Sequence, residues 1–144
     1  MFKTYISALL IVLGGCSTFK KEVVNCPLTT SPKGTEETIA NSQNNLPVYI
    51  GFRGIELICV KNGSYIDMEA VVNIRSIRNN INEDDYAPIK ISLVSINDNN
   101  EEYDRDDFQY SQFLLKGKRI IDRITKMNIE VPIKGKVLIG IKSF

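Results

Sequence analysis

The stretch ELICVKNGSYIDMEAVVNIRSI, residues 56–77, contains the clearest structural signal in the chain. Asn62-Gly63 lies between two apolar runs, and this pair is the strongest short signal for a β-hairpin because both central residues of a type I′ turn need positive φ. In the second run the apolar side chains occupy every second position: Ile66, Met68, Ala70, Val72 and Ile74. That period of two predicts a strand with one buried face and one largely solvated face.

From Val48 onward the chain repeats this pattern of short apolar runs separated by turn residues. Further strands are expected over residues 87–96, 101–110, 119–133 and 136–142, although Ile120, Ile121 and Ile124 also fit a helical turn. The expected core positions in these runs are Ile89, Ile91, Leu93, Ile129, Val131, Ile133, Val137, Ile139 and Ile141, with Tyr103, Phe108 and Tyr110 as the apolar contribution of residues 101–110.

About seven strands with hairpin-length connections predict an all-β fold, an antiparallel β-sandwich of the immunoglobulin or fibronectin-III type. A small barrel is the alternative. Pro132 lacks a backbone N–H and therefore predicts an edge strand or a bulge at the end of its run.

The N-terminus has the order of an export signal. Lys3 supplies one positive charge, an apolar run covers residues 6–13, and small residues precede a cysteine. Leu13-Gly14-Gly15-Cys16 resembles the lipobox of bacterial lipoproteins, which predicts removal of residues 1–15 and lipid attachment at Cys16. The alternative is an ordinary secretory signal that leaves Cys16 as a thiol. Because Ser17 and not an aspartate follows the cysteine, we expect the outer membrane, facing the periplasm.

Removal of residues 1–15 leaves 144 − 15 = 129 residues, enough for one domain. That segment carries one charge, Lys3, so 18 − 1 = 17 basic side chains face 17 acidic ones. This balance gives no electrostatic reason to expect nucleic-acid binding. The chain has no histidine, which excludes Ser-His-Asp and Cys-His catalysis and His-ligated zinc or haem within it.

The three cysteines divide into Cys16, assigned to lipid, and the pair Cys26 and Cys59. In an oxidising compartment a disulfide is the expected state of such a pair. A two-thiolate metal site or a redox-active pair are the alternatives. Residues 16–46 are polar and contain two prolines, so we expect an acylated tether there, with a possible short helix at residues 35–41, and the β-sandwich domain over residues 47–144.

These landmarks resemble a family of small alphaproteobacterial, rickettsia-like outer-membrane lipoproteins of unknown function. The resemblance rests on Cys16, on Cys26-Pro27 soon after it, and on Cys59 ahead of Asn62-Gly63. Its other landmarks are residues 71–75, 89–94 and 137–141. Together the landmarks are spread over most of the mature chain. The resemblance implies a location and a fold, and no reaction.

The acidic segment at residues 98–107 is the sharpest candidate for chemistry. Oxygen-bearing side chains occupy alternate positions and suggest a calcium site: Asp98, Asn100, Glu102, Asp104 and Asp106. An EF-hand loop needs a glycine at its sixth position and a bidentate acid at its twelfth, but this sequence has Tyr103 and Gln109 there. A solvated hairpin tip is therefore the competing interpretation. A ligand groove could also be lined by aromatic residues, although core packing explains them equally well: Tyr49, Phe52, Tyr65, Tyr103, Phe108 and Tyr110.

Together these patterns predict a membrane-anchored envelope lipoprotein with a non-catalytic β-sandwich that has a structural or protein-interaction role. We expect no cofactor, attachment to the membrane through lipid on Cys16, and another envelope protein as partner. A periplasmic lipoprotein that binds a small ligand or calcium is the alternative function. A hydrolase built on paired carboxylates is the weakest hypothesis, because nothing in the sequence places two carboxylates across a cleft.

Overall fold

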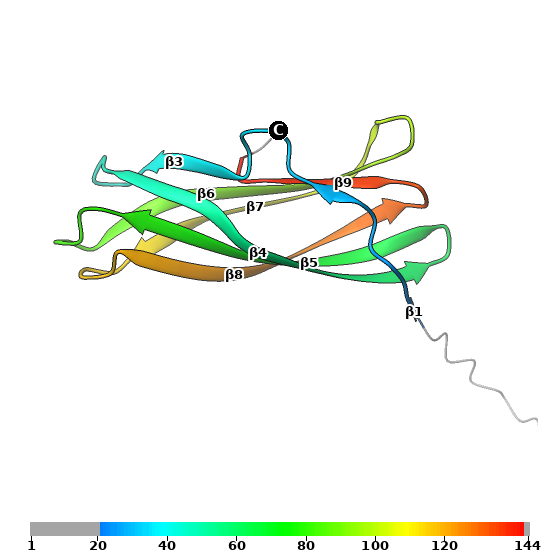
Figure 1. Cartoon of the computed structure of the whole chain (residues 1–144), viewed down its shortest axis with the longest axis horizontal. Helices are drawn as coiled ribbons and strands as arrows, with labels where there is room; N and C mark the ends of the chain where they lie inside the picture. Colours follow the sequence, from blue (N-terminus) through cyan, green and yellow to red (C-terminus); the bar gives the residue numbers. More distant parts are fainter. Residues whose placement is uncertain (1–20, 143–144) are drawn as a thin grey trace, which may run out of the picture.

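The computed structural model describes residues 21–142, which form two β-sheets packed face to face (Figure 1). No helix occurs among these residues, so none there could cross a membrane. The lipobox and the first residues of the expected tether lie outside the described part. The expected all-β sandwich is confirmed, with nine strands where about seven were expected; three of the nine are short strands near the N-terminus.

The first sheet contains three long strands, β4 (Pro47–Asn62), β5 (Tyr65–Arg78) and β8 (Ile120–Pro132). Two short strands, β1 (Glu22–Val23) and β3 (Glu37–Asn41), pair with opposite ends of β4 along the same edge. Strand β8 lies at the other edge of this sheet, and it ends at Pro132 as the missing N–H of proline predicts. The whole run from Ile120 is a strand, so the helical-turn interpretation of its start is wrong.

The second sheet has the order β2-β9-β6-β7. Its strands are β2 (Thr29–Thr30), β6 (Asp85–Ile96), β7 (Glu102–Leu114) and β9 (Lys136–Gly140). All pairs are antiparallel except β2 with β9. The β-ladders do not join the two sheets into one closed cylinder, so the barrel alternative does not apply to the described residues.

The hairpin between β4 and β5 is confirmed, but its turn differs from the expected one. Asn62 pairs with Tyr65, so the central residues are Gly63 and Ser64. Gly63 has φ 64°, whereas neither Asn62 nor Ser64 has positive φ. A single positive φ at the first central residue is the mark of a type II′ turn, for which glycine is the preferred residue.

A bulge in β4 decides which of its side chains face the core. The register shifts between Phe52 and Gly54. Before the shift, even-numbered Val48 and Ile50 are buried, whereas after it odd-numbered Cys59 is buried. A shift of one residue exchanges the two faces of a strand, and here it turns Cys59 inward.

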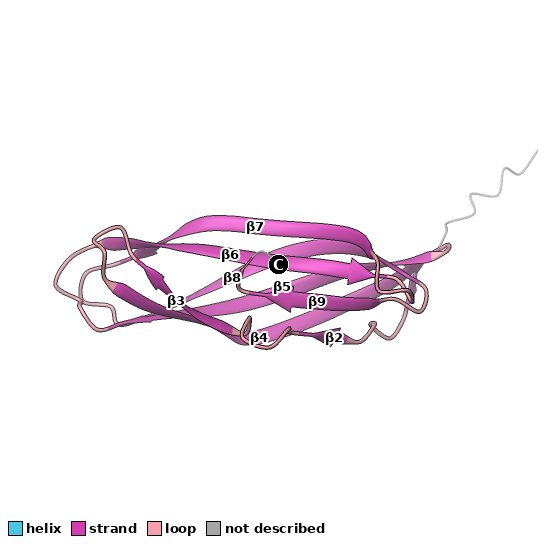
Figure 2. Cartoon of the chain, turned by 90° about the horizontal axis from the view of Figure 1, so that it is seen from above, coloured by secondary structure: helices cyan, strands magenta, loops and turns pink. Residues whose placement is uncertain are grey.

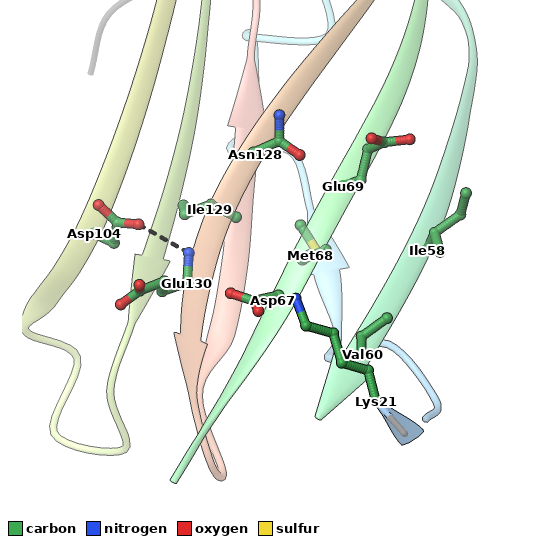
Figure 3. A pocket seen from close by; sticks show the side chains of 10 residues that line it. All are labelled: Lys21, Ile58, Val60, Asp67, Met68, Glu69, Asp104, Asn128, Ile129 and Glu130. Atoms are coloured by element: carbon green, nitrogen blue, oxygen red, sulfur yellow. Dashed lines mark hydrogen bonds between the residues drawn. The ribbon is translucent and has the colours of Figure 1, made fainter. Parts of the chain in front are cut away.

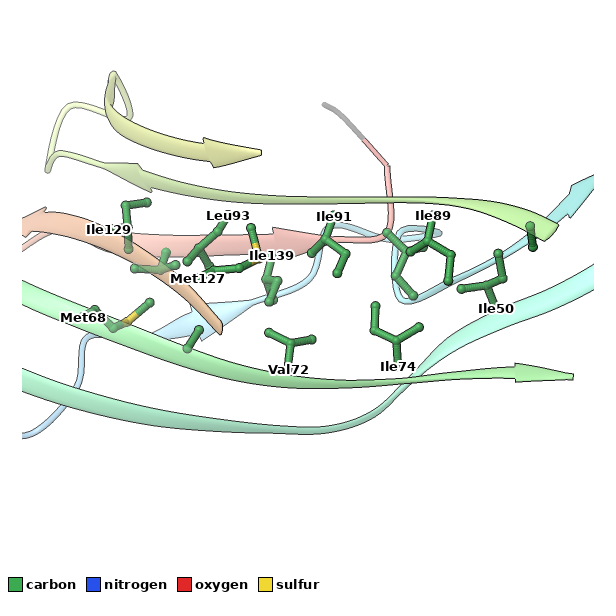
Figure 4. Packing of buried hydrophobic residues seen from close by; sticks show 14 of the residues in the cluster. Ile50, Met68, Val72, Ile74, Ile89, Ile91, Leu93, Met127, Ile129 and Ile139 are labelled. Carbon is green, nitrogen blue, oxygen red and sulfur yellow. The ribbon is translucent and has the colours of Figure 1, made fainter. Parts of the chain in front are cut away.

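The core between the sheets contains the side chains that alternation predicts (Figure 4). Met68, Val72 and Ile74 of β5 face Ile89, Ile91, Leu93 and Ile139 of the second sheet, with Met127 and Ile129 from β8. Ile133 is an exception: it is 46% exposed because β8 ends one residue earlier and the chain turns there. Phe108 and Tyr110 pack against the core, whereas Tyr103 is on the opposite face of β7 and is exposed.

The N-terminal residues 21–41 form a strap that closes one side of the sandwich, so the structure differs from the expected tether. The strap leaves the edge of β4 at Cys59, pairs with β9 in the second sheet, and returns to β4 as β3. The N–H of Ile141 donates to the carbonyl of Thr35, and the N–H of Phe52 donates to the carbonyl of Glu36. Residues 37–41 are a strand, so the possible helix there is wrong.

The Cys26–Cys59 disulfide holds this strap against β4 and confirms the expected pairing of these two cysteines. Their Cα atoms are 5.2 Å apart, within the usual range for a disulfide. The bond joins residues 33 positions apart. The sandwich therefore begins well before residue 47, the domain boundary expected from composition.

Candidate functional site

One groove of the described residues lies near the end of the sandwich at which β1 enters (Figure 3). It has a volume of about 520 Å³ and gathers side chains from the neighbouring strands β4, β5 and β8, from Asp104 of β7 and from Lys21 just before β1. Ile58 and Val60 form an aliphatic wall, and the buried residues Met68 and Ile129 lie beneath. This volume is within the range of small-ligand pockets.

The groove carries an excess of negative charge, and we call it the acidic groove. Asp67, Glu69, Asp104 and Glu130 supply four carboxylates, against the single ammonium of Lys21 among the lining residues. The Lys21 side chain extends along the groove toward Asp67 in Figure 3. Partial burial, followed by the charges of Glu130, Asp67 and Tyr103, raises the pKa of the neighbouring Tyr65. The groove therefore favours cations over anions.

The acidic segment that suggests calcium has another role along β8. The carboxylate of Asp104 accepts the N–H of Glu130 at 2.8 Å, and that of Asp106 accepts the N–H of Asn128 at 3.0 Å. These side chains cross from β7 to the outer edge of β8 and satisfy backbone donors that an edge strand leaves unpaired.

The remaining members of the acidic segment have local partners or lie in the adjoining turn. The guanidinium of Arg105 donates two hydrogen bonds to the carboxylate of Glu102, each 2.9 Å long, and makes a longer contact of 3.3 Å with Asp107. Asn97 organises the β6–β7 turn by accepting the N–H groups of Asn99 and Glu101. Within residues 21–142, no three acidic or cysteine side chains converge as metal ligands would.

The opposite end of the sandwich consists of three connections, residues 42–46, 79–84 and 115–119, which we call the loop end (Figure 2). Arg78 organises two of them from a buried position, 5% exposed. Its guanidinium donates to the carbonyls of Lys118, Glu83 and Leu115 at 3.1, 3.0 and 2.7 Å. A planar group with five donors can satisfy several carbonyls at once, which a lysine cannot do in the same geometry.

Asp85 joins the third connection to this network. Its carboxylate accepts the N–H groups of Asn44 at 3.1 Å and Tyr86 at 2.8 Å, and a hydrogen bond from the Ser42 hydroxyl. Burial alone would raise the pKa of Asp85, but these hydrogen bonds and the charge of Arg78 bring that pKa below its usual value. The loop end is thus held in one conformation by buried polar groups.

The six aromatic residues considered as a groove do not form one. Phe52, Phe108 and Tyr110 pack against the core, whereas Tyr49, Tyr65 and Tyr103 lie on outward faces. The guanidinium of Arg123 lies 4.0 Å from the centre of the Tyr110 ring, a cation–π contact. Burial raises the pKa of Tyr110 to about 12, although Arg123 acts in the opposite direction.

Sequence reasoning missed a different aromatic pair, Tyr86 and Phe113. These two residues are cross-strand neighbours on β6 and β7, 45% and 41% exposed, with ring centres 5.2 Å apart. Both alternate with buried residues along their own strands, so the alternation in the sequence does predict that they are exposed. Their contact depends on the β6–β7 register, which only the fold reveals.

No protein-family model, curated protein or solved structure matches this chain. The class that the described residues define is therefore a disulfide-bonded, all-β sandwich.

Proposed function

We propose that this protein is a lipid-anchored lipoprotein of the bacterial envelope whose β-sandwich binds a partner and catalyses no reaction. The observation that carries the proposal is the allocation of the three cysteines. Cys26 and Cys59 form a disulfide, a bond that persists in exported proteins. Cys16, at the end of Leu13-Gly14-Gly15-Cys16, is then the one cysteine left for acylation.

The arrangement of the two ends supports the binding role. The chain enters the sandwich at β1, and the loop end lies at the other end of the long axis (Figure 1). An anchor at Cys16 would therefore hold one end at the membrane and direct the preorganised loop end outward. Rigid surfaces bind with a smaller loss of conformational entropy than mobile ones, and confinement to a membrane raises the effective concentration for a partner in the same envelope.

The proposed location is the outer membrane, with the domain in the periplasm, and the proposed partner is another envelope protein. A non-catalytic role is supported by the absence of histidine from the sequence. Three carboxylates of the acidic groove, those of Asp67, Glu69 and Glu130, lie on the outer face of the first sheet, and the fourth, that of Asp104, already accepts the N–H of Glu130. That arrangement supports charge-based attraction of a partner better than opposed acid and base groups across a cleft.

The test separates the roles of the cysteines. In cells labelled with a palmitate analogue, the wild type should incorporate label and fractionate with membranes, whereas Cys16→Ser should lose the label and become soluble. The matched controls Cys26→Ser and Cys59→Ser should keep the label and the membrane fraction. Labelling of Cys16→Ser, or release of all three variants from membranes, would contradict the proposed anchor.

A further inference from the structure

A second pocket, separate from the acidic groove, lies beside the loop end on the outer face of the second sheet. We call it the Tyr86 pocket. It has a volume of about 480 Å³ and its lining residues are Asn41, Ser42, Gln43, Tyr86, Pro88 and Ser111. This size is typical of small-molecule sites. The residues come from the end of β3, the turn after it, and the neighbouring strands β6 and β7.

The pocket is built on a fixed frame. The N–H of Gln43 donates to the carbonyl of Tyr86 at 2.8 Å, which joins the β3–β4 turn to the edge of β6. Ser42 is 6% exposed, and its hydroxyl accepts the N–H of Leu46 at 3.1 Å. The Tyr86 ring leans on Phe113 at an interplanar angle of 45°. The ring is therefore held in place while much of its surface stays accessible, so a ligand would find it already ordered.

Pro88 continues the same surface. Because the carbonyl of Tyr86 points away from β7 to Gln43, the backbone polar groups of Pro88, two residues later, point to that same open edge. Strand β9 pairs with β6 only from Ser92 onward, so it does not cover this edge. A proline there has no N–H to leave unpaired, and its ring adds apolar surface beside Tyr86.

The polar groups of the pocket are uncharged and available. The side chains of Asn41, Gln43 and Ser111 are exposed and have no hydrogen-bond partner among the described residues. Each amide both donates and accepts, as does the hydroxyl. None of the six lining residues is charged. An ionic ligand would thus lose hydration without gaining a counter-charge.

We propose that the Tyr86 pocket binds an uncharged pyranose unit of a glycan. A sugar ring presents C–H groups that pack on an aromatic face, with hydroxyls around its rim that both donate and accept. Tyr86 supplies the face and a phenolic hydroxyl, and Asn41, Gln43 and Ser111 supply neutral partners for the rim. Phosphorylated or strongly anionic ligands are disfavoured because no lining residue is cationic. The inference does not depend on the anchor at Cys16.

The experiment uses the full chain with the Cys26–Cys59 disulfide intact. Chitotetraose and maltotetraose, both uncharged, are titrated to tens of millimolar while backbone amide signals are followed by NMR. The two sugars distinguish an N-acetylated glycan from a plain hexose polysaccharide. We expect saturable shifts for at least one of them, confined to Gln43, Tyr86 and Ser111 and their neighbours. Loss of one aromatic contact in Tyr86→Ala should weaken binding about tenfold.

Tyr103→Ala is the matched control, because Tyr103 is a similarly exposed tyrosine at the opposite end of β7, 49% exposed. This variant should bind as the wild type does. Gln43→Ala provides a second variant that keeps both rings, and it should weaken binding severalfold. Absence of shifts with both sugars would overturn the proposal. Unchanged affinity in Tyr86→Ala, equal loss in Tyr103→Ala, or shifts only for a proline-rich peptide offered in parallel would also overturn it.

Discussion

Asp104 and Asp106 show how the role of a single residue depends on its strand neighbour. In the sequence they suggest a calcium ligand set, whereas in the fold they accept backbone N–H groups of Glu130 and Asn128. An exposed edge strand can pair with another chain and aggregate, and charged side chains at the edge oppose that pairing. These aspartates therefore contribute to stability and to solubility at once.

Asp104→Ala and Asp106→Ala should each lower the free energy of unfolding by about 1 kcal/mol, because each leaves one edge N–H of β8 without its protein acceptor. Urea denaturation measures the change. Asp98→Ala is the control, since Asp98 lies in the β6–β7 turn, has no partner among the described residues, and should alter stability by less than about 0.5 kcal/mol. Equal effects at all three positions would indicate that net charge, and not edge capping, is responsible.

Asp85 gives the stability of the loop end a pH dependence. Its pKa lies below the usual 3.8 in the folded protein, so its stabilising contribution is present above that value and is lost as the pH falls toward the folded pKa. Asp85→Asn should flatten the decline in unfolding free energy between about pH 5 and pH 2. Ser42→Ala removes one donor and should give an intermediate slope. A wild-type slope in Asp85→Asn would refute this assignment.

Among the elements, the first part of the strap, which contains β1 and β2, has few hydrogen bonds of its own and is held by the disulfide, whereas β3 pairs with β4 along its whole length. Strands β1 and β2 have two residues each, too few to be stable without attachment. Closing a loop across 33 positions reduces the entropy of the unfolded chain, a stabilisation of roughly 3–4 kcal/mol in the chain-entropy model.

The double variant Cys26→Ala/Cys59→Ala should therefore unfold at a clearly lower urea concentration than the oxidised wild type. Amide exchange at β1 and β2 should become faster, while the centres of β5 and β6 keep their protection until global unfolding. Wild-type protein treated with a reductant should resemble the variant. Unchanged protection of β2 in the variant would show that pairing with β9 is sufficient to hold the strap.

The elements with a regular alternation of buried and exposed residues were the ones that the sequence predicted best. Strands β5, β6, β8 and β9 were expected within a few residues of their observed bounds, because alternation and turn residues are local signals. The strand pattern was expected from Val48 onward with the first hairpin arm at residues 56–61, whereas the structure has one continuous strand, β4, from Pro47 to Asn62. The bulge after Phe52 reverses its inward-facing parity, and a pattern that changes parity does not read as one strand.

At the scale of the whole molecule, the sandwich is elongated with distinct ends (Figure 1). Strand β8 alone has 13 residues, a length of about 40 Å. If Cys16 carries lipid, residues near β1 lie close to the bilayer and the loop end lies far from it. The Tyr86 pocket would then be near the outward end, and the acidic groove near the membrane.

Fluorophores attached to Lys61→Cys and Lys118→Cys test this orientation in lipidated protein bound to vesicles. Lys61 pairs with Glu22 of β1, whereas Lys118 lies in the turn between β7 and β8. A quencher on lipid headgroups should quench the label at position 61 strongly and that at position 118 weakly. Equal quenching would mean that the sandwich lies flat on the membrane, and stronger quenching at position 118 would reverse the assigned orientation.

The all-β class, the inner faces of the long strands and the pairing of Cys26 with Cys59 could be predicted from the sequence, because alternation, turn chemistry and cysteine number are properties of short segments or of composition. Three features could not be predicted in this way: residues 21–41 belong to the sandwich, Asp104 and Asp106 cap β8, and Tyr86 and Phe113 are in contact. Those features arise from contacts between residues far apart in the chain, and two-residue strands are too short to show a period. The lipobox remains a prediction from the sequence, and Cys16→Ser is the variant that tests it.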